Sequence, residues 1–123
     1  MLTSDPCIPM YYVIHISMDE FKTQLKKGTI ELLILALLNK KNTYGREFIE
    51  ILHNNNIEVT EGTIYPLLAR LKTLNYVQSY LEESTQGGTR KYYVITQKGR
   101  EYYAHIEKEL KEYFNNINKI INK

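Results

Sequence analysis

Cysteine, tryptophan and long apolar runs are scarce or missing in this chain of 123 residues, and each absence excludes something. The single cysteine, Cys7, cannot form a disulfide within the chain, so a disulfide-stapled fold is excluded. The longest apolar run, residues 30–38, is interrupted by Glu31 and is about half the roughly 20 residues that a membrane span needs. No signal peptide is recognisable either. We therefore expect a soluble, reduced, cytoplasmic protein with no membrane partner.

Catalytic and metal-binding patterns are missing as well. The three histidines, His15, His53 and His105, fall on separate predicted elements. The sequence shows no supported Ser/His/Asp, Cys/His or paired-carboxylate pattern and no glycine-rich phosphate loop. Cys7 and His15 are too few to make a metal site. The sequence thus predicts a protein that is not an enzyme and needs no cofactor or metal.

The charge distribution says more than the total charge. The net charge of +2 is too small to indicate a nucleic-acid partner by itself. From Ser84 to Arg100, however, the chain has four basic residues and no acidic one. A local basic stretch of this kind is the electrostatic footprint of nucleic-acid binding, although a solvated loop would have the same composition.

Periodicity and capping residues predict four helices and one β-hairpin. In chain order they are a helix over Asp19–Leu38, a helix over Thr43–Asn54, a helix over Thr60–Leu74, strands over Tyr76–Leu81 and Arg90–Thr96, and a helix from Gln97 almost to Lys123. Thr43 and Thr60 are the predicted N-caps, and Pro66 predicts a kink or a tight first turn in the third helix. A loose loop with Gly87-Gly88 at its tip joins the strands. Residues 1–17 are predicted to be an irregular N-terminal extension, with Met18 as an alternative start of translation.

Two segments are too apolar for a small monomer. Residues 30–38 are apolar on nearly all faces. The terminal helix carries apolar residues spaced 3 and 4 apart over roughly two and a half heptads, on a helix about 30 Å long. Packing on the chain's own core is the alternative, but the outer half of such a helix needs a partner. The prediction is a homodimer whose interface contains Leu33, Leu37, Tyr103, Ile106, Leu110, Tyr113, Ile117 and Ile120.

The order of elements predicts the fold class. Three helices, a hairpin with a basic, glycine-tipped loop, and a last helix indicate a mainly α fold with a small β-hairpin (α+β), namely a winged helix-turn-helix with a long C-terminal dimerisation helix. The predicted parts are the extension at residues 1–17, a DNA-binding domain at residues 18–96 and the dimerisation helix at residues 97–123. In such a domain the second helix of the helix-turn-helix enters the major groove.

Five motifs carry a family resemblance. They are QLKKGTIELLILALL (24–38), TYG (43–45), EVTEGTIYPLLARL (58–71), GGTRKYYVIT (87–96) and KG (98–99). In these motifs and their order the sequence resembles the PadR family of transcriptional regulators, in its short branch with a single C-terminal helix. The resemblance covers about residues 22–110 and implies a sequence-specific regulator, which we expect to be a repressor acting as a homodimer on a pseudo-palindromic operator in double-stranded DNA. A winged-helix module that binds a protein partner without specific DNA recognition is the alternative.

The resemblance and the wing suggest a set of DNA-binding residues. They are Lys26, Thr60, Gly62, Thr63, Tyr65, Arg70, Gly88, Thr89, Arg90 and Lys91. Thr63, Tyr65 and Arg70 are the candidates for base readout, and the basic residues Lys26, Arg90 and Lys91 for phosphate contacts. Tyr44-Gly45 puts a small residue where two helices must approach. Tyr92 and Tyr93 alternate across a strand, so one of them faces the core, and we expect no direct DNA role for that one.

A small-molecule effector is also implied by the resemblance. Family members of this type are typically released from DNA by an aromatic or lipophilic compound, which can lie between the first and terminal helices of the dimer. Leu33, Leu37, Tyr103, Ile106 and Tyr113 offer apolar and aromatic lining there, with core packing as the alternative for each. The chain has no tryptophan to stack on a planar ligand. The sequence does not name the operator or the regulated genes.

Overall fold

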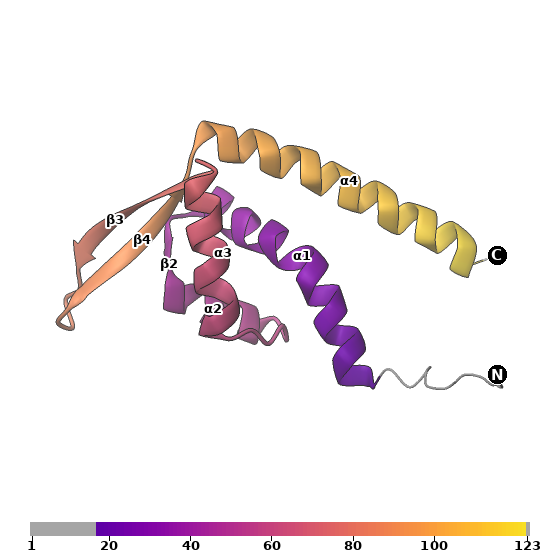
Figure 1. Ribbon diagram of the computed structural model, residues 1–123, viewed down its shortest axis with the longest axis horizontal. Helices are drawn as coiled ribbons and strands as arrows, with labels where there is room; N and C mark the ends of the chain where they lie inside the picture. Colours follow the sequence, from indigo (N-terminus) through magenta and orange to yellow (C-terminus); the bar gives the residue numbers. More distant parts are fainter. Residues whose placement is uncertain (1–16, 123) are drawn as a thin grey trace. The chain divides into compact units, whose positions relative to one another are not determined.

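The computed structural model describes residues 17–122, in four helices and three strands. The elements are α1 (Met18–Lys40), β2 (Thr43–Tyr44), α2 (Gly45–Asn54), α3 (Glu61–Thr73), β3 (Val77–Glu83), β4 (Thr89–Ile95) and α4 (Gln97–Ile121) (Figure 1). The predicted mainly helical fold with a small hairpin is confirmed. The predicted N-terminal extension lies outside the described residues except for Ser17. By its contacts the chain divides into residues 1–30 and 31–123, and each unit is described by itself.

The first unit contributes the start of α1. The Ser17 hydroxyl accepts a hydrogen bond from the Glu20 N–H at 3.1 Å, and the Glu20 carboxylate accepts one from the Ser17 N–H at 3.3 Å. This reciprocal pair is a capping box, which satisfies two amide donors at the helix start. Met18, Phe21 and Leu25 are exposed along this part of the helix. The described part of this unit is therefore a helix with a capped N-terminus and a row of exposed apolar side chains.

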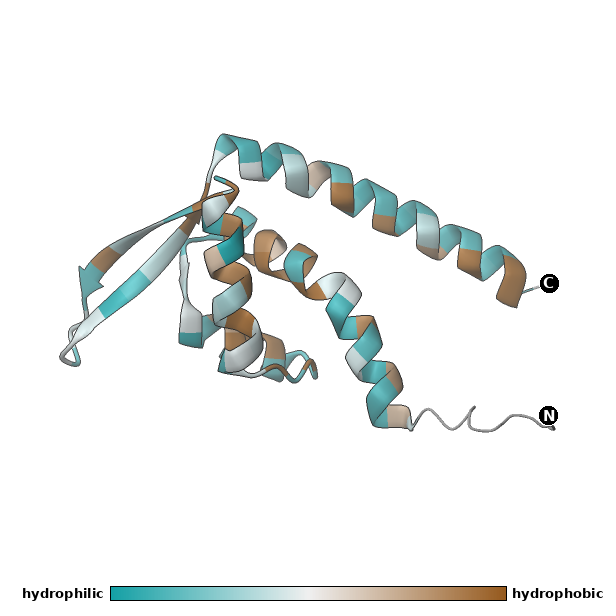
Figure 2. Ribbon diagram, in the orientation of Figure 1, coloured by the Kyte–Doolittle hydropathy of each residue, from teal (hydrophilic) through white to brown (hydrophobic). Residues whose placement is uncertain are grey.

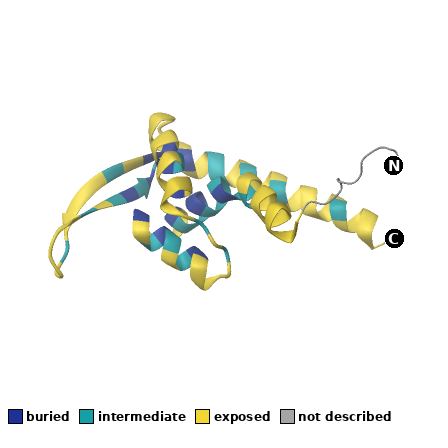
Figure 3. Cartoon of the chain, turned by 60° about the horizontal axis from the view of Figure 1, so that its bottom comes forward, coloured by how far each residue is buried: buried dark blue, intermediate teal, exposed yellow. Residues whose placement is uncertain are grey.

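The core of the second unit joins the last part of α1 to α2, α3 and the sheet (Figure 3). Its side chains are at most 8% exposed. They are Ile34, Leu35 and Leu38 from α1, Phe48 and Leu52 from α2, Ile64, Leu68 and Leu71 from α3, and Val77, Tyr93 and Ile95 from the hairpin. The 3-and-4 spacing on α3 turns one face of that helix inward, as its periodicity predicts. The opposite face of α3 is left in solvent.

The sheet contains a strand that the sequence analysis missed. Its order is β2-β4-β3, with both pairings antiparallel. Thr43 pairs with Tyr93 and Tyr44 with Tyr92, so Thr43 lies in the sheet and is fully buried. The prediction that Thr43 caps the second helix is wrong, because Tyr44 holds the N-cap position and the Thr43 hydroxyl donates back to the Lys41 carbonyl at 3.0 Å.

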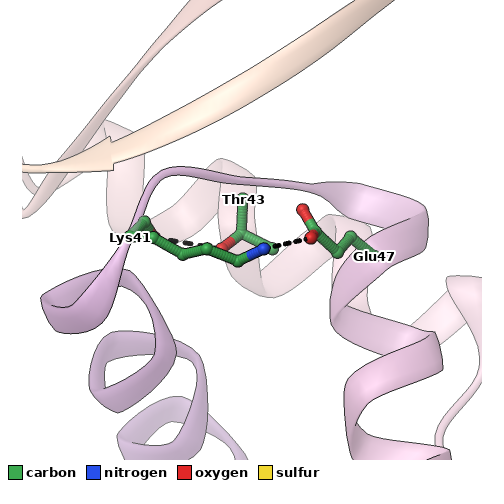
Figure 4. A network of polar contacts seen from close by, with 3 residues as sticks. All are labelled: Lys41, Thr43 and Glu47. Carbon is green, nitrogen blue, oxygen red and sulfur yellow. Dashed lines mark hydrogen bonds and ion pairs between the residues drawn. The ribbon is translucent and has the colours of Figure 1, made fainter.

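An ion pair closes the turn from α1 into α2 (Figure 4). The Lys41 ammonium lies 2.6 Å from the Glu47 carboxylate, on the far side of β2 in the sequence. This hydrogen bond and charge pairing raise the pKa of Lys41. Together with the Thr43 hydrogen bond, the pair fixes how the chain enters the first turn of α2.

The start of α3 is tightly wound. The N–H groups of Thr63 and Ile64 both donate to the carbonyl of Thr60, each at 3.0 Å. The bond from Thr63 spans three residues rather than four, which tightens the turn. α3 continues past Pro66 without a break. A tight first turn is one of the two accommodations expected for Pro66, and it is observed.

The wing loop between β3 and β4 is more ordered than predicted. The Ser84 N–H donates to the Gly88 carbonyl at 2.9 Å, and the Gly87 N–H donates to the Ser84 carbonyl at 3.1 Å. Gly87 and Gly88 have φ angles of 93° and 81°, which glycine adopts without steric cost. The prediction of a loose loop is wrong, because the two glycines allow a hydrogen-bonded turn.

α4 begins at a closely packed junction and then leaves the core. The Thr96 hydroxyl accepts from the Gly99 N–H at 3.0 Å and donates to the Asn75 carbonyl at 2.7 Å. From there the helix runs for 25 residues, about 37 Å at 1.5 Å per residue. Among the helices of residues 17–122, none is long and apolar enough to cross a membrane.

Candidate nucleic-acid interface

A groove opens between the start of α2, the start of α3 and the wing strand β4. Its volume is about 530 Å³. The lining residues are Tyr44, Gly45, Arg46, Glu50, Tyr65, Thr89, Arg90, Lys91 and Tyr93. Four of the ten predicted DNA-binding residues are thereby brought together: Tyr65, Thr89, Arg90 and Lys91. The groove is called the α2–wing groove below.

Tyr65 crosses from α3 to the first residue of α2. A Cβ atom placed on Gly45 would lie 2.4 Å from Cε1 of Tyr65 and 2.7 Å from its hydroxyl oxygen. Glycine is required for this approach, which confirms the prediction that Gly45 lies where two helices meet. The side chain of Tyr65 is still 41% exposed. Its hydroxyl therefore lies beside the N-terminus of α2 and within reach of a ligand.

Tyr93 forms the buried floor of the groove. It is 8% exposed, and its ring lies 6.5 Å from that of Phe48, centroid to centroid. Burial, reinforced by the nearby Tyr65 hydroxyl, raises the pKa of Tyr93. Within the described part of the chain, neither the Tyr65 nor the Tyr93 hydroxyl has a hydrogen-bond partner.

Arg90 and Lys91 leave β4 on opposite faces of the sheet. The Arg90 guanidinium lies 4.5 Å from the centroid of the Tyr44 ring, on the face away from Tyr93. Lys91 shares the face of Tyr93 because strand side chains alternate. It is exposed and has no ion pair with any residue from 17 to 122. The two basic residues of the wing therefore have different surroundings.

A tyrosine row covers the face that holds Arg90. Tyr44 meets Tyr92 edge-on at 5.3 Å, and Tyr92 stacks on Tyr80 at 5.7 Å with an interplanar angle of 13°. The Tyr80 hydroxyl accepts a hydrogen bond from Asn42 at 3.1 Å. One tyrosine comes from each strand, so the row ties the three strands together. The Arg90 guanidinium lies over the ring of Tyr44 in this row.

The other predicted DNA-binding residues are spread more widely. Thr60, Gly62 and Thr63 lie exposed at the start of α3, and Gly88 lies exposed in the wing loop. Arg70 lies on a later turn of α3, where its Nη1 is 3.4 Å from Oε2 of Glu31. Lys26 belongs to the unit of residues 1–30 and is not placed relative to the groove. The start of α3 and the wing thus gather most of the set, without Arg70 or Lys26.

The sequence analysis missed several groove residues. Tyr44, Arg46 and Glu50 line it, and so does Tyr93, the core-facing member of the Tyr92–Tyr93 pair, for which no direct DNA role was expected. Arg46 forms an ion pair with Glu61 of α3 at 2.7 Å. The TYG motif was the available signal for Tyr44, whereas the positions of Arg46 and Glu50 depend on how α2 packs against the wing.

Apolar, brown positions recur along α4 (Figure 2), where the predicted interface residues of this helix are spaced 3 and 4 apart. Tyr103, Ile106, Leu110 and Ile117 are half-buried, as are Leu33 and Leu37 of α1. Tyr113 and Ile120 are 64% and 76% exposed. Phe114 and Ile121, which the heptad analysis did not include, are also exposed, at 47% and 70%. The outer half of α4 therefore carries a broader uncovered apolar strip than was predicted.

Comparison with known proteins identifies the family. The sequence model of the Transcriptional regulator PadR-like family matches residues 34–105. A solved PadR-like transcription factor from Bacteroides fragilis is 40% identical, covers 83% of this chain and 99% of its own, and has a TM-score of 0.68. A PadR-like transcriptional regulator from Bacillus cereus is 31% identical, covers 81% and 98%, and has a TM-score of 0.73. An uncharacterized protein of Lysinibacillus sphaericus is 31% identical over 94 residues, which are 74% of this chain and 86% of that protein. The chain therefore belongs to the PadR-like family of transcriptional regulators, which are DNA-binding proteins and not enzymes.

Proposed function

We propose that the protein is a homodimeric transcriptional repressor that binds a pseudo-palindromic operator in double-stranded DNA. Residues 18–96 would be the DNA-binding domain and residues 97–123 the dimerisation helix. The observation that carries the proposal is the exposed N-terminus of α3, together with a groove that brings Tyr65 of α3 beside Arg90 and Lys91 of the wing. A helix that enters the major groove and a wing that lies along the backbone need this arrangement.

The roles of the DNA-binding residues follow from their positions. Thr63 and Tyr65 lie near the N-terminus of α3, the part of a recognition helix that contacts base edges. Thr60 and Gly62 lie at the end where free amides and the helix dipole favour a phosphate oxygen. Arg70 would contact base edges after its guanidinium separates from the Glu31 carboxylate. Gly88, Thr89, Arg90 and Lys91 contact the backbone from the wing, and Lys26 contacts it from α1.

Dimerisation is supported by the uncovered side chains of α4. Tyr113, Phe114, Ile120 and Ile121 are between 47% and 76% exposed on a helix that extends well past the sheet (Figure 1). Burying an apolar side chain of this size contributes about 1.5–3 kcal/mol. A second copy of the chain offers the same strip, and an isologous contact would cover both copies at once.

Gel shift with DNA upstream of the protein's own gene tests DNA recognition. Affinity should exceed that for mixed-sequence DNA, and log K should fall with log salt by about 0.9 per neutralised phosphate. Lys91→Ala should flatten this slope and weaken all sequences alike, whereas Lys119→Ala on α4 serves as a matched control. Equal affinity for upstream and mixed-sequence DNA would contradict operator recognition. If expression of this protein raises transcription from the promoter that it binds, the repressor role is contradicted.

Sedimentation tests the homodimer. The wild-type chain should sediment at about twice 14.5 kDa at micromolar concentration. Leu110→Asp should shift it toward the monomer, because an unpaired carboxylate is costly in an apolar contact. Asn115→Asp adds the same charge on the opposite side of α4 and should leave the dimer intact. A wild-type monomer at these concentrations would contradict the proposal.

A small aromatic or lipophilic effector stays a prediction that a ligand screen can test. The expected compound raises the melting temperature and lowers operator affinity, since binding free energies of two ligands are coupled reciprocally. Planar apolar compounds and aromatic acids are the first set to screen. A compound that stabilises the protein but leaves operator affinity unchanged is not an effector.

A further inference from the structure

We propose that the α2–wing groove is a preformed site for one phosphate group, and that its occupant in the DNA complex is a phosphodiester of the backbone. This inference deepens the proposed function and rests on it for the choice of occupant. The donors are the first-turn amides of α2 and the hydroxyls of Tyr65 and Tyr93, with the Lys91 ammonium at the rim. The expectation that the core-facing tyrosine has no DNA role is thereby revised.

The first element of the site is the N-terminus of α2. This helix has ten residues, and the side chain of its N-cap, Tyr44, makes no capping hydrogen bond. The first N–H groups of a helix have no partner within the helix. They and the helix dipole favour an anion at this end. Gly45 and Arg46, the first two residues of α2, both line the groove.

The second element is the buried hydroxyl of Tyr93. Only 8% of this residue is exposed, and its hydroxyl has no hydrogen-bond partner among residues 17–122. Buried side-chain hydroxyls nearly always have a partner, either in the protein or in a bound group. Tyr93 lines the groove, and the Tyr65 hydroxyl, which also lacks a protein partner, lies near it. Two tyrosine hydroxyls beside a helix N-terminus form a donor set for an anionic oxygen.

Gly45 makes this donor set geometrically feasible. A Cβ at this position would overlap the Tyr65 ring at 2.4 Å, so any other residue would push the ring away from the helix start. The displaced atoms would belong to the end of a partly exposed side chain and not to the backbone. An alanine at position 45 should therefore alter the groove more than it alters stability.

The charges around the groove favour a singly charged occupant. Of the cations that line the groove, Arg90 and Lys91 have no ion pair with any residue from 17 to 122, whereas Arg46 is already paired with Glu61 at 2.7 Å. The Glu50 carboxylate also lines the groove and would repel an anion. Inorganic phosphate carries up to two charges at neutral pH, and a phosphodiester carries one. The diester is thus the better match, and only DNA can bring it together with contacts to the neighbouring wing and α3.

Tyr93→Phe is the central test, with a 20-base-pair mixed-sequence duplex as the probe. The variant removes only the unpartnered hydroxyl, so duplex affinity should fall roughly three- to tenfold, the equivalent of one lost hydrogen bond. Tyr80→Phe makes the same chemical change on the other face of the sheet and is the matched control. The melting temperature of Tyr93→Phe should not fall, because no protein partner is lost. Equal duplex affinity of Tyr93→Phe and Tyr80→Phe would overturn the proposal.

Gly45→Ala supplies a second, independent variant. Displacement of Tyr65 should lower duplex affinity by a similar factor while the protein stays folded. Gly28→Ala is the control, since a Cβ there has no atom within 4 Å. Wild-type duplex affinity in Gly45→Ala would overturn the role given to the Tyr65 hydroxyl.

Amide resonances of residues 45–47 separate the two phosphate sources. The duplex should shift them at micromolar concentration, and inorganic phosphate only at millimolar concentration. Tight binding of inorganic phosphate that competes with the duplex would overturn the choice of a diester. If the wild-type protein binds no duplex at all, the proposed function fails, and the inorganic phosphate titration decides the site alone. Shifted amide resonances of residues 45–47 would then support a phosphate site, and unchanged resonances would contradict it.

Discussion

Two junctions in this protein depend on a missing Cβ, and they differ in what the Cβ would meet. At Gly99, where α4 leaves the sheet, it would lie 2.1 Å from the backbone carbonyl oxygen of Tyr76. At Gly45, where β2 turns into α2, it would lie 2.4 Å from the ring of Tyr65. A carbonyl held in the backbone cannot move aside, whereas a tyrosine ring that is 41% exposed can.

The difference separates stability from function. The Gly99 junction is fixed from several directions, because the Tyr76 carbonyl also accepts a hydrogen bond from the Thr96 N–H at 3.0 Å and the Ile95 side chain would lie 2.8 Å from the same Cβ. The Gly45 junction borders a groove whose two tyrosine hydroxyls have no protein partners within residues 17–122. In the sequence both positions look alike, as a glycine near the start of a helix.

Gly99→Ala should produce the largest effect. Because the backbone of Tyr76 cannot yield, we expect the free energy of unfolding to fall by about 3 kcal/mol, the upper part of the range for overpacking. Urea denaturation followed by circular dichroism at fixed protein concentration measures this loss. Gly45→Ala is the matched comparison and should lose about 1 kcal/mol or less, the lower end of the range for overpacking, because the partly exposed Tyr65 ring can move aside. Equal losses of unfolding free energy in the two variants would contradict the distinction between the two junctions.

Tyr102→Phe sharpens the description of the Gly99 junction as a fixed region. Tyr102 lies one turn into α4, and its hydroxyl donates to the Glu31 carboxylate of α1 at 2.7 Å. Its ring stacks on Tyr76 at 4.3 Å, which phenylalanine would preserve. Loss of this charge-assisted hydrogen bond should lower the free energy of unfolding by about 1.5 kcal/mol. Tyr113→Phe, at a 64% exposed position, should leave it unchanged. Equal stability of the two variants would contradict the role of Tyr102 as an anchor.

Unfolding at alkaline pH tests the same Tyr102–Glu31 hydrogen bond through the ionisation of the Tyr102 hydroxyl. The hydrogen bond to Glu31, with burial and the negative charge of Glu31, raises the pKa of Tyr102 from 10.0 to about 12. A raised pKa means that the folded state holds its proton more tightly, so this stabilisation is complete below pH 10 and is lost between about pH 10 and 12. Tyr93 and Tyr103 also have raised pKa values and add to the slope. The difference between wild type and Tyr102→Phe should therefore shrink as the pH rises through this range. A difference that stays constant would contradict the assignment.

The helices could be predicted from the sequence because their signals are local. The 3-and-4 spacing, with Thr60 at the start of α3, placed α3 and α4 within about two residues of their observed ends. Strand β2 could not be found in this way, since two residues show no period and its partner β4 is distant in the chain. Thr43 is a good N-cap by residue type, but pairing with Tyr93 and full burial determine its position instead.

The candidate site was predictable only in part. The recognisable motifs located the start of α3 and the basic wing, because each of these features lies within one continuous stretch of sequence. The opposite orientations of Arg90 and Lys91 follow from strand alternation, but that Lys91 shares the face of Tyr93 and Arg90 that of Tyr44 depends on the pairing of β4 with β2. The importance of Tyr93 rests on the absence of a partner for its hydroxyl, which no sequence pattern reports.

Gly28→Ala should produce the smallest effect, with the opposite sign. Gly28 lies inside α1, and a Cβ there would have no atom within 4 Å. Alanine exceeds glycine in helix propensity by about 1 kcal/mol, so stability should rise by roughly 0.5–1 kcal/mol. The measurement is again urea denaturation, paired with duplex affinity and sedimentation. A rise in stability with unchanged binding would place Gly28 apart from Gly45 and Gly99, as a glycine that no neighbour requires. A gain in stability together with weaker dimerisation or DNA binding would instead show that another chain approaches α1 at this position, and a loss of stability would contradict the prediction.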